Sequence, residues 1–291
     1  MKKTALLLSF ALFTLVLTSW EWKKNQHPTV QKGDVIECLN METQQAYQLE
    51  ASTPAFANLH ISPMNVNPTD LAGTMIQFDA ADGNKANAYF IPAKKKSNKW
   101  LIVIQEWWGL NDNIKMEADQ YFKDLGDMNV IAVDMYDGKV AATPDSAMKL
   151  MRGADMARMT AIIQGAIKKA GADAAIYSVG WCFGGMWSLQ TAILAGPQAK
   201  GTVMYYGRPE SNMEKLKSIQ CDVIGFFGNQ DQSPSPAMVN DFEKNMKEAG
   251  KNLSVNRYEA NHGFANPSNP SFNPTATADA YTKAVAFLKA H

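Results

Sequence analysis

Cys182 is the residue whose setting points most directly to chemistry. It lies in the segment GWCFGG, Gly180 to Gly185, after an apolar run and before a stretch with helical character. A sharp strand-to-helix turn of the form G-x-S-x-G, here with cysteine in place of serine, presents a nucleophile at the edge of an α/β sheet. Glycines suit such a turn because it brings backbone segments too close for a Cβ atom, and the helix N-terminus favours the reactive thiolate. Cys182 is therefore the candidate nucleophile; the alternative is an incidental cysteine in a glycine-rich phosphate-binding turn.

His262 is the candidate general base. The chain holds four histidines, His27, His60, His262 and His291. The first two lie in an N-terminal extension and the last ends the chain, whereas His262 follows an apolar run in a loop, downstream of the turn. We therefore select His262 by elimination and by its topological place.

Asp231 is the candidate third member of a catalytic triad. In folds with this kind of turn, the chain order is nucleophile, acid, histidine. Asp231 lies between Cys182 and His262 and comes just after the apolar run 223–227. It would orient the imidazole and stabilise the imidazolium. The alternatives are that Asp231 caps the next helix or that Asp134, at another predicted strand end, takes the role.

Two backbone N–H groups are the candidates for an oxyanion hole. One belongs to Phe183, directly after the nucleophile, and the other to Trp107, beyond the predicted strand 100–105. Glu106 lies beside Trp107 at the same strand end. A carboxylate there can keep a nearby thiol protonated or relay a proton, or it can be a surface group paired with a basic neighbour.

These residues require a parallel sheet whose strand ends meet at one edge. Residues 74–78 and 87–91 flank the turn signal Asp82-Gly83-Asn84 and predict an opening hairpin. The pattern that follows predicts an α/β-hydrolase fold, with a mostly parallel sheet and helices on both faces. The predicted strands are 100–105, 130–134, 175–180, 201–206, 223–227 and 253–258. The predicted helices are 114–125, 144–170 with a break near Gly153, 184–194, 236–249 and 277–289.

Composition excludes some functions and the N-terminus suggests a location. The chain has 291 residues, 46% hydrophobic, and its 28 basic residues equal its 28 acidic ones, so no net charge is available to hold nucleic acid. Residues 1–19 have the basic start and short apolar run of a signal peptide, which predicts a periplasmic or secreted protein without stable membrane insertion after cleavage. An uncleaved membrane anchor is the alternative. Residues 20–73 are interpreted as an extension and 74–291 as one domain.

Two other functions remain open from the sequence. Cys182 could cycle through sulfenic acid in a thiol redox protein, with Cys38 or Cys221 resolving it; those two could also form a disulfide or be buried thiols. The chain could instead be a non-catalytic ligand-binding protein with an apolar pocket. Its aromatic candidates are Trp107, Trp108, Trp181 and Trp187.

In these and neighbouring segments the chain resembles the dienelactone hydrolase family, from about Thr74 to Leu288. The segments that carry the resemblance are Gln105-Glu106 with Gly109, Asp134-Met135-Tyr136, Gly180 to Gly185, Tyr205-Tyr206-Gly207, Gly228 to Asp231 and His262-Gly263-Phe264. The resemblance implies a cofactor-independent and metal-independent hydrolase of small esters or lactones that uses Cys182, Asp231 and His262. It also implies that Glu106 holds the thiol neutral at rest and moves away when substrate binds.

The sequence departs from the family in its substrate-binding residues. Well-studied members hold a substrate carboxylate with arginines, one of them shortly after the triad histidine, where this chain has Ala265-Asn266-Pro267. The candidate substrate-binding residues here are Tyr136, Lys139, Arg208 and Trp108. The partner implied is a small-molecule ester or lactone, and the sequence does not set the oligomeric state.

Overall fold

The computed structural model describes residues 42–58, 60, 62, 68 and 70–291. The predicted signal peptide and Cys38 lie outside this range. The described residues from 42 onward belong to one compact unit. Among them, no helix combines the length and apolarity needed to cross a lipid bilayer.

An eight-stranded sheet forms the centre of this unit, in the order β1-β2-β4-β3-β5-β6-β7-β8. The hairpin β1 (Thr74–Asp79) and β2 (Lys85–Ile91) is antiparallel, and β2 pairs antiparallel with β4 (Asn129–Val133). All later pairings are parallel, as the predicted α/β-hydrolase fold requires. The remaining strands are β3 (Lys99–Ile104), β5 (Ala175–Trp181), β6 (Ala199–Tyr205), β7 (Asp222–Gly228) and β8 (Leu253–Tyr258).

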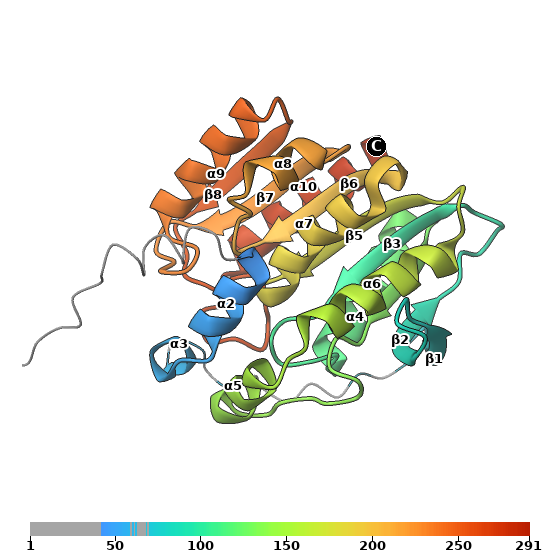
Figure 1. Ribbon diagram of the computed structural model, residues 1–291, viewed down its shortest axis with the longest axis horizontal. Coiled ribbons are helices and arrows are strands. Elements are labelled where there is room, and N and C mark those ends of the chain that lie inside the picture. The colour runs from blue at the N-terminus through green and yellow to red at the C-terminus, as the bar shows by residue number, and fades with distance from the viewer. Residues whose placement is uncertain (1–41, 59, 61, 63–67, 69) are drawn as a thin grey trace, which may run out of the picture. The chain divides into compact units, whose positions relative to one another are not determined.

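Helices cover both faces of the sheet (Figure 1). On one face α6 (Met156–Ala170) and α7 (Phe183–Ala195) pack together, and on the other α4 (Asp112–Leu125) packs against α10 (Pro274–Ala290). The predicted break at Gly153 is confirmed, since α5 (Pro144–Arg152) ends there and α6 starts after it. The other described helices of this region are α8 (Met213–Ser218), which the sequence analysis did not predict, and α9 (Pro236–Glu248). Strands β3 to β7 are buried almost throughout, because helices exclude water from both sides.

Two short helices precede the sheet and pack against each other and against α5. They are α2 (Thr43–Ala51) and α3 (Pro54–Asn58), both inside the stretch that the sequence analysis treats as an extension. Both contact α5, and in Figure 1 α2, drawn in blue, lies near the start of α7. The sequence pattern did not reveal them, because helices of nine and five residues are too short to show a clear repeat of apolar positions.

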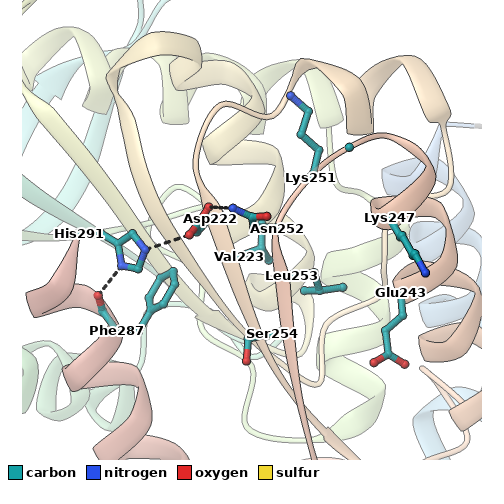
Figure 2. Close-up of a pocket in the computed structure, with 11 residues that line it drawn as sticks. Asp222, Val223, Glu243, Lys247, Lys251, Asn252, Leu253, Ser254, Phe287 and His291 are labelled. Atoms are coloured by element: carbon teal, nitrogen blue, oxygen red, sulfur yellow. Dashed lines mark hydrogen bonds and ion pairs between the residues drawn. The ribbon is translucent and has the colours of Figure 1, made fainter.

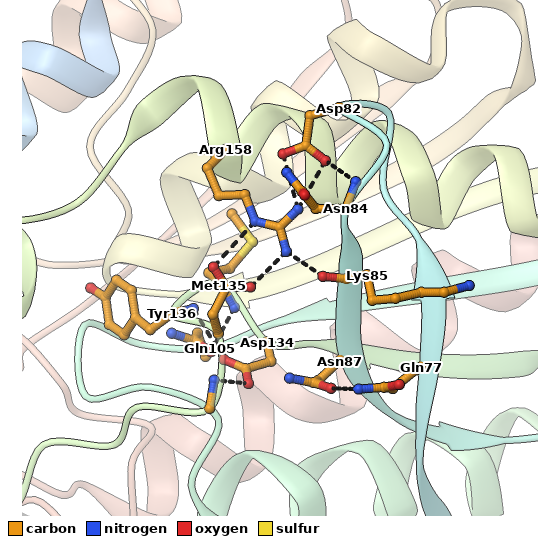
Figure 3. A network of polar contacts seen from close by, with 12 residues as sticks. Gln77, Asp82, Asn84, Lys85, Asn87, Gln105, Asp134, Met135, Tyr136 and Arg158 are labelled. Atoms are coloured by element: carbon orange, nitrogen blue, oxygen red, sulfur yellow. Dashed lines mark hydrogen bonds and ion pairs between the residues drawn. The ribbon is translucent and has the colours of Figure 1, made fainter.

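A polar network fixes the loop that follows β4 (Figure 3). Arg158 of α6 forms ion pairs with Asp82 and Asp137 and donates to the carbonyl of Lys85. Asp134 accepts hydrogen bonds from the backbone N–H groups of Tyr136 at 3.0 Å and Gly138 at 2.5 Å. The loop that carries Tyr136 is thereby held in one conformation.

Candidate active site

The turn around Cys182 has the geometry expected of a nucleophile elbow. Cys182 lies between β5 and α7 with φ 56° and ψ −119°, a left-handed φ that a residue with a side chain rarely adopts. Its N–H donates to the carbonyl of Tyr205 at 2.9 Å. A Cβ on Gly184 would lie 2.2 Å from the carbonyl oxygen of Ile104, so only glycine fits there. The surroundings therefore enforce the strained conformation.

Asp231 and His262 form the pair that the sequence analysis anticipates. Oδ2 of Asp231 lies 2.8 Å from Nδ1 of His262, and Oδ1 accepts from the N–H of Ser233 at 2.9 Å. Asp231 is 5% exposed. Neither alternative applies: Ser235, not Asp231, caps α9, and the carboxylate of Asp134 is occupied by its own loop.

The sulfur of Cys182 lies near two imidazoles. One ring nitrogen of His262, one of His60 and Sγ of Cys182 all lie within 4.8 Å of one another. Because Nδ1 of His262 faces Asp231, Nε2 is the nitrogen that remains for the sulfur; it has no hydrogen-bond partner in the described part of the chain. Sγ of Cys182 is 3.3 Å from the hydroxyl of Tyr47.

The pKa values of the two histidines are shifted in opposite directions by their surroundings. Burial opposes a charge on His262, but the carboxylate of Asp231 and the thiolate of Cys182 outweigh it, so the pKa of His262 lies well above its ordinary value. Burial, and then the neighbouring charge of His262, lowers the pKa of His60 to about 3. His60 is therefore neutral at physiological pH, whereas His262 is suited to hold a proton beside a thiolate.

Glu106 is buried near His262 but is bound to other partners than the thiol. Its Oε2 accepts from Nδ2 of Asn266 at 2.6 Å and its Oε1 from the hydroxyl of Tyr206 at 3.3 Å. Burial raises the pKa of Glu106. The surface-carboxylate alternative does not hold, since the side chain is 5% exposed.

Residues that the sequence analysis missed cover the nucleophile. Tyr47 of α2, Phe56 of α3 and His60 come from the N-terminal segment, and we call residues 42–60 the cap. The ring of Phe56 lies 5.2 Å from that of Trp107, and the ring of His60 lies 5.0 Å from that of His262. Under the cap, Cys182 is only 2% exposed. The elimination of His60 by its place in the chain was therefore a poor guide to its place in space, and no sequence pattern marks it.

The four candidate substrate-binding residues have different surroundings. Arg208 forms an ion pair with Glu50 of the cap, so its charge is already balanced. Lys139 is exposed, and its backbone lies against Gly109. The ring of Tyr136 packs 5.7 Å from that of Phe183, and its hydroxyl contacts the sulfur of Met151. Trp108 is 3% exposed and packs on Trp107.

Two cavities differ in their relation to this site. A small one of about 110 Å³ is lined by residues that include His60, Asp231 and His262. A wider one of about 780 Å³ is shown in Figure 2 and is lined by the first residues of β7 and β8 together with Lys247, Lys251 and His291. It lies at the amino ends of those strands, whereas ligands of open parallel sheets bind at the carboxyl ends. The larger cavity is therefore separate from the candidate site.

The redox alternative finds no partner for Cys182 in the described residues. Cys182 and Cys221 are both free thiols. Cys221 lies just before β7, at the amino ends of the parallel strands, whereas Cys182 lies just after β5, at their carboxyl ends. Burial, and then the charge of Asp222, raises the pKa of Cys221 to about 12, which makes it a poor resolving thiol.

Comparison with known proteins shows which family the chain belongs to. The model of the dienelactone hydrolase family matches residues 86–291. The chain belongs to the dienelactone hydrolase family. This membership supports a hydrolase of small-molecule esters or lactones, in agreement with the resemblance drawn from the sequence.

Individual relatives are distant but cover the whole hydrolase region. "Protein usf" of Aquifex pyrophilus is 29% identical, over 75% of this chain and 98% of the relative. A putative carboxymethylenebutenolidase of Aquifex aeolicus is 26% identical, over 75% of this chain and 99% of the relative. The crystal structure of a putative dienelactone hydrolase from Klebsiella pneumoniae subsp. pneumoniae MGH 78578 has a TM-score of 0.65 at 20% identity, over 76% of this chain and 100% of the other; that likeness shows the shared fold.

The cap lies outside the part of the chain that matches the family model. Residues 42–60 precede residue 86, where the match begins. Tyr47 and His60 therefore lie outside the matched region, whereas Cys182, Asp231 and His262 lie within it.

Proposed function

We propose that this protein hydrolyses small carboxylic esters or lactones with Cys182 as the nucleophile. The observation that carries the proposal is that Asp231 holds Nδ1 of His262, which leaves Nε2 for the nearby sulfur of Cys182. A thiolate beside an imidazolium is the reactive state of cysteine hydrolases, and the raised pKa of His262 favours that state.

In the proposed reaction, the thiolate attacks the carbonyl carbon and forms a tetrahedral oxyanion. Phe183 is the first residue of α7, where backbone N–H groups have no acceptor within the helix, and it would donate to that oxyanion together with the N–H of Trp107. His262 then gives its proton to the leaving alkoxide, which leaves an acyl-enzyme. A water molecule deprotonated by His262 attacks the thioester, releases the carboxylic acid and restores the thiol.

The cap sets a condition on this reaction. Cys182 is almost fully buried and the hydroxyl of Tyr47 contacts its sulfur, so a substrate reaches the thiol only when α2 is displaced or the side chain of Tyr47 moves. Because Arg208 is paired with Glu50, we propose that the substrate does not need a carboxylate of its own.

The direct test is replacement of the nucleophile. Cys182→Ala is expected to lower kcat/KM for short aryl esters by about 10⁴-fold or more, because the residues of a triad act as a unit. Cys221→Ala, the matched control at the other edge of the sheet, is expected to keep the wild-type rate. A short-lived increase in protein mass by one acyl group is expected in the wild type and in Cys221→Ala, but not in Cys182→Ala. Hydrolysis retained by Cys182→Ala would reject the proposal.

A further inference from the structure

Three side chains at the candidate active site place donor atoms close enough together to hold a metal ion. Sγ of Cys182 and one nitrogen each from His60 and His262 lie within 4.8 Å of one another. A thiolate and two neutral imidazoles form a donor set that favours Zn²⁺ and similar soft divalent ions. The triad accounts for Cys182 and His262. It does not account for His60, which the cap brings in from outside the region that matches the family model.

The orientation of both imidazoles suits a metal. Nδ1 of His60 lies 2.8 Å from the carbonyl oxygen of Phe56, and Nδ1 of His262 lies 2.8 Å from Oδ2 of Asp231. Each acceptor fixes its ring with a proton on Nδ1 and leaves the lone pair of Nε2 free. Metal-binding histidines are oriented in this manner by a carbonyl or carboxylate behind the ring.

Nε2 of His60 is otherwise unexplained, whereas Nε2 of His262 faces the sulfur of Cys182 in the proposed triad. Both are buried and neither has a hydrogen-bond partner among the residues that the structure describes. His60 is 6% exposed, so an unpaired nitrogen there has lost its contact with water without gaining a partner among the described residues. A bound ion would satisfy both nitrogens at once.

The distances allow such an ion with small movements. An ion at the centre of a triangle with 4.8 Å sides is about 2.8 Å from each corner, and zinc needs about 2.0–2.3 Å. Inward shifts of less than about 1 Å by the three side chains close the gap.

We infer that His60, His262 and Cys182 bind Zn²⁺ or a similar soft divalent ion, and that the bound ion blocks the hydrolase. Cys182 and His262 share one proton, which metal binding releases to solvent, so that the sulfur and Nε2 of His262 each form a bond to the metal. The ion would also take the lone pair of His262 Nε2, which the triad needs. The inhibitory part of this inference rests on the proposed function, whereas the binding part does not.

The experiment uses the full chain after treatment with a chelator and its removal. Calorimetric titration with ZnCl₂ is expected to show one high-affinity ion per chain, and titration with CoCl₂ to show a thiolate-to-cobalt charge-transfer band. His60→Ala and the bulkier His60→Gln are expected to weaken Zn²⁺ binding at least about 10- to 100-fold. His291→Ala and Cys221→Ala, the matched controls, are expected to bind as the wild type does.

The outcomes separate the two proposals. Ester hydrolysis should fall as Zn²⁺ is added and recover when chelator is added. In the His60 variants, inhibition should require a higher Zn²⁺ concentration. The rate of each variant is compared with its own zinc-free rate. Equal Zn²⁺ affinity in wild type and both His60 variants, or a cobalt band that survives Cys182→Ala, would overturn the metal site. Hydrolysis that survives Cys182→Ala would instead overturn the proposed function and leave the binding result intact.

Discussion

At the scale of single residues, the pairing of Asp231 with His262 has a consequence for pH dependence. The carboxylate, together with the thiolate, holds the pKa of His262 above its ordinary value against the effect of burial. If the active state is an imidazolium beside a thiolate, activity is lost as pH rises through the pKa of His262. Asp231→Asn is expected to lower kcat/KM by about 10²- to 10⁴-fold and to move the alkaline limb of its pH profile to lower pH.

A second histidine–carboxylate pair provides the control for that change. His291 lies 3.1 Å from Asp222 at the surface, away from the carboxyl ends of the strands. Asp222→Asn should leave both the rate and the pH profile in place. An alkaline limb that does not move in Asp231→Asn would show that the carboxylate does not support the charge on His262.

Glu117 gives a prediction for stability at the same scale. Burial, and then the charge of Glu106, raises its pKa from 4.5 to about 7. Because the folded pKa is raised, the stability linked to its protonated form is fully present below about pH 4.5 and is lost as pH rises through about 7. Glu117→Gln is therefore expected to raise the free energy of unfolding at pH 8 by on the order of 1 kcal/mol, with little effect at pH 4.

Urea unfolding at the two pH values measures this difference. Glu214→Gln, which changes an exposed carboxylate in α8, is the control and should show no such pH-dependent gain. A stability gain of equal size at both pH values would mean that the charge of Glu117 is not the cause.

At the scale of elements, the turn from β5 into α7 depends on the absence of side chains. In Gly184→Ala the new Cβ would lie 2.2 Å from the carbonyl oxygen of Ile104 and 2.4 Å from that of Gln105, both backbone atoms that cannot swing away. The free energy of unfolding is expected to fall by about 3 kcal/mol or more.

Gly153→Ala is the matched control for the elbow. Its new Cβ would lie 3.6 Å from the nearest atom, the carbonyl oxygen of Lys149, which is an ordinary contact, and its φ of −89° suits any residue. The shift of the urea midpoint should be small. If Gly184→Ala unfolded at the wild-type midpoint, the elbow would be less constrained than these distances indicate.

At the scale of the whole molecule, the cap joins the start of the described chain to its centre. Two ion pairs, Glu50 with Arg208 and Glu42 with Lys215, hold it in place. The hydroxyl of Thr43 also donates a hydrogen bond to the buried Glu210 at 2.5 Å. An ion pair that is partly exposed contributes at most about 1 kcal/mol, a factor of roughly 5 in an equilibrium. Glu50→Ala is therefore expected to increase the rate at which a thiol reagent labels Cys182 by about 2- to 5-fold.

The exposed pair of Glu214 and Lys217 offers a comparison that does not involve the cap. Glu214→Ala should leave the labelling rate of Cys182 unchanged. The labelling of Cys221, counted by mass spectrometry, should be the same in both variants as in the wild type. Labelling of Cys182 that does not respond to Glu50→Ala would mean that this ion pair does not hold the cap closed.

The sequence by itself determined the fold class and the residues at the carboxyl ends of the strands. Its apolar runs predicted the hairpin and the six later strands to within two residues at each end, since a buried parallel strand is written as a continuous apolar segment. The order of Cys182, Asp231 and His262 along the chain indicated which strand ends to compare, and the structure brings all three together.

Tertiary structure alone decided what covers the site. Tyr47 and His60 lie more than a hundred residues before Cys182, the first in α2 and the second just after α3, and both helices are too short for periodicity to reveal. Their contacts with the sulfur and with His262 arise only from packing. The partners of Glu106 and the pairing of Arg208 with Glu50 were equally hidden. Local patterns record whether a residue is buried, but not which distant side chain it meets, because that depends on the path of the whole chain.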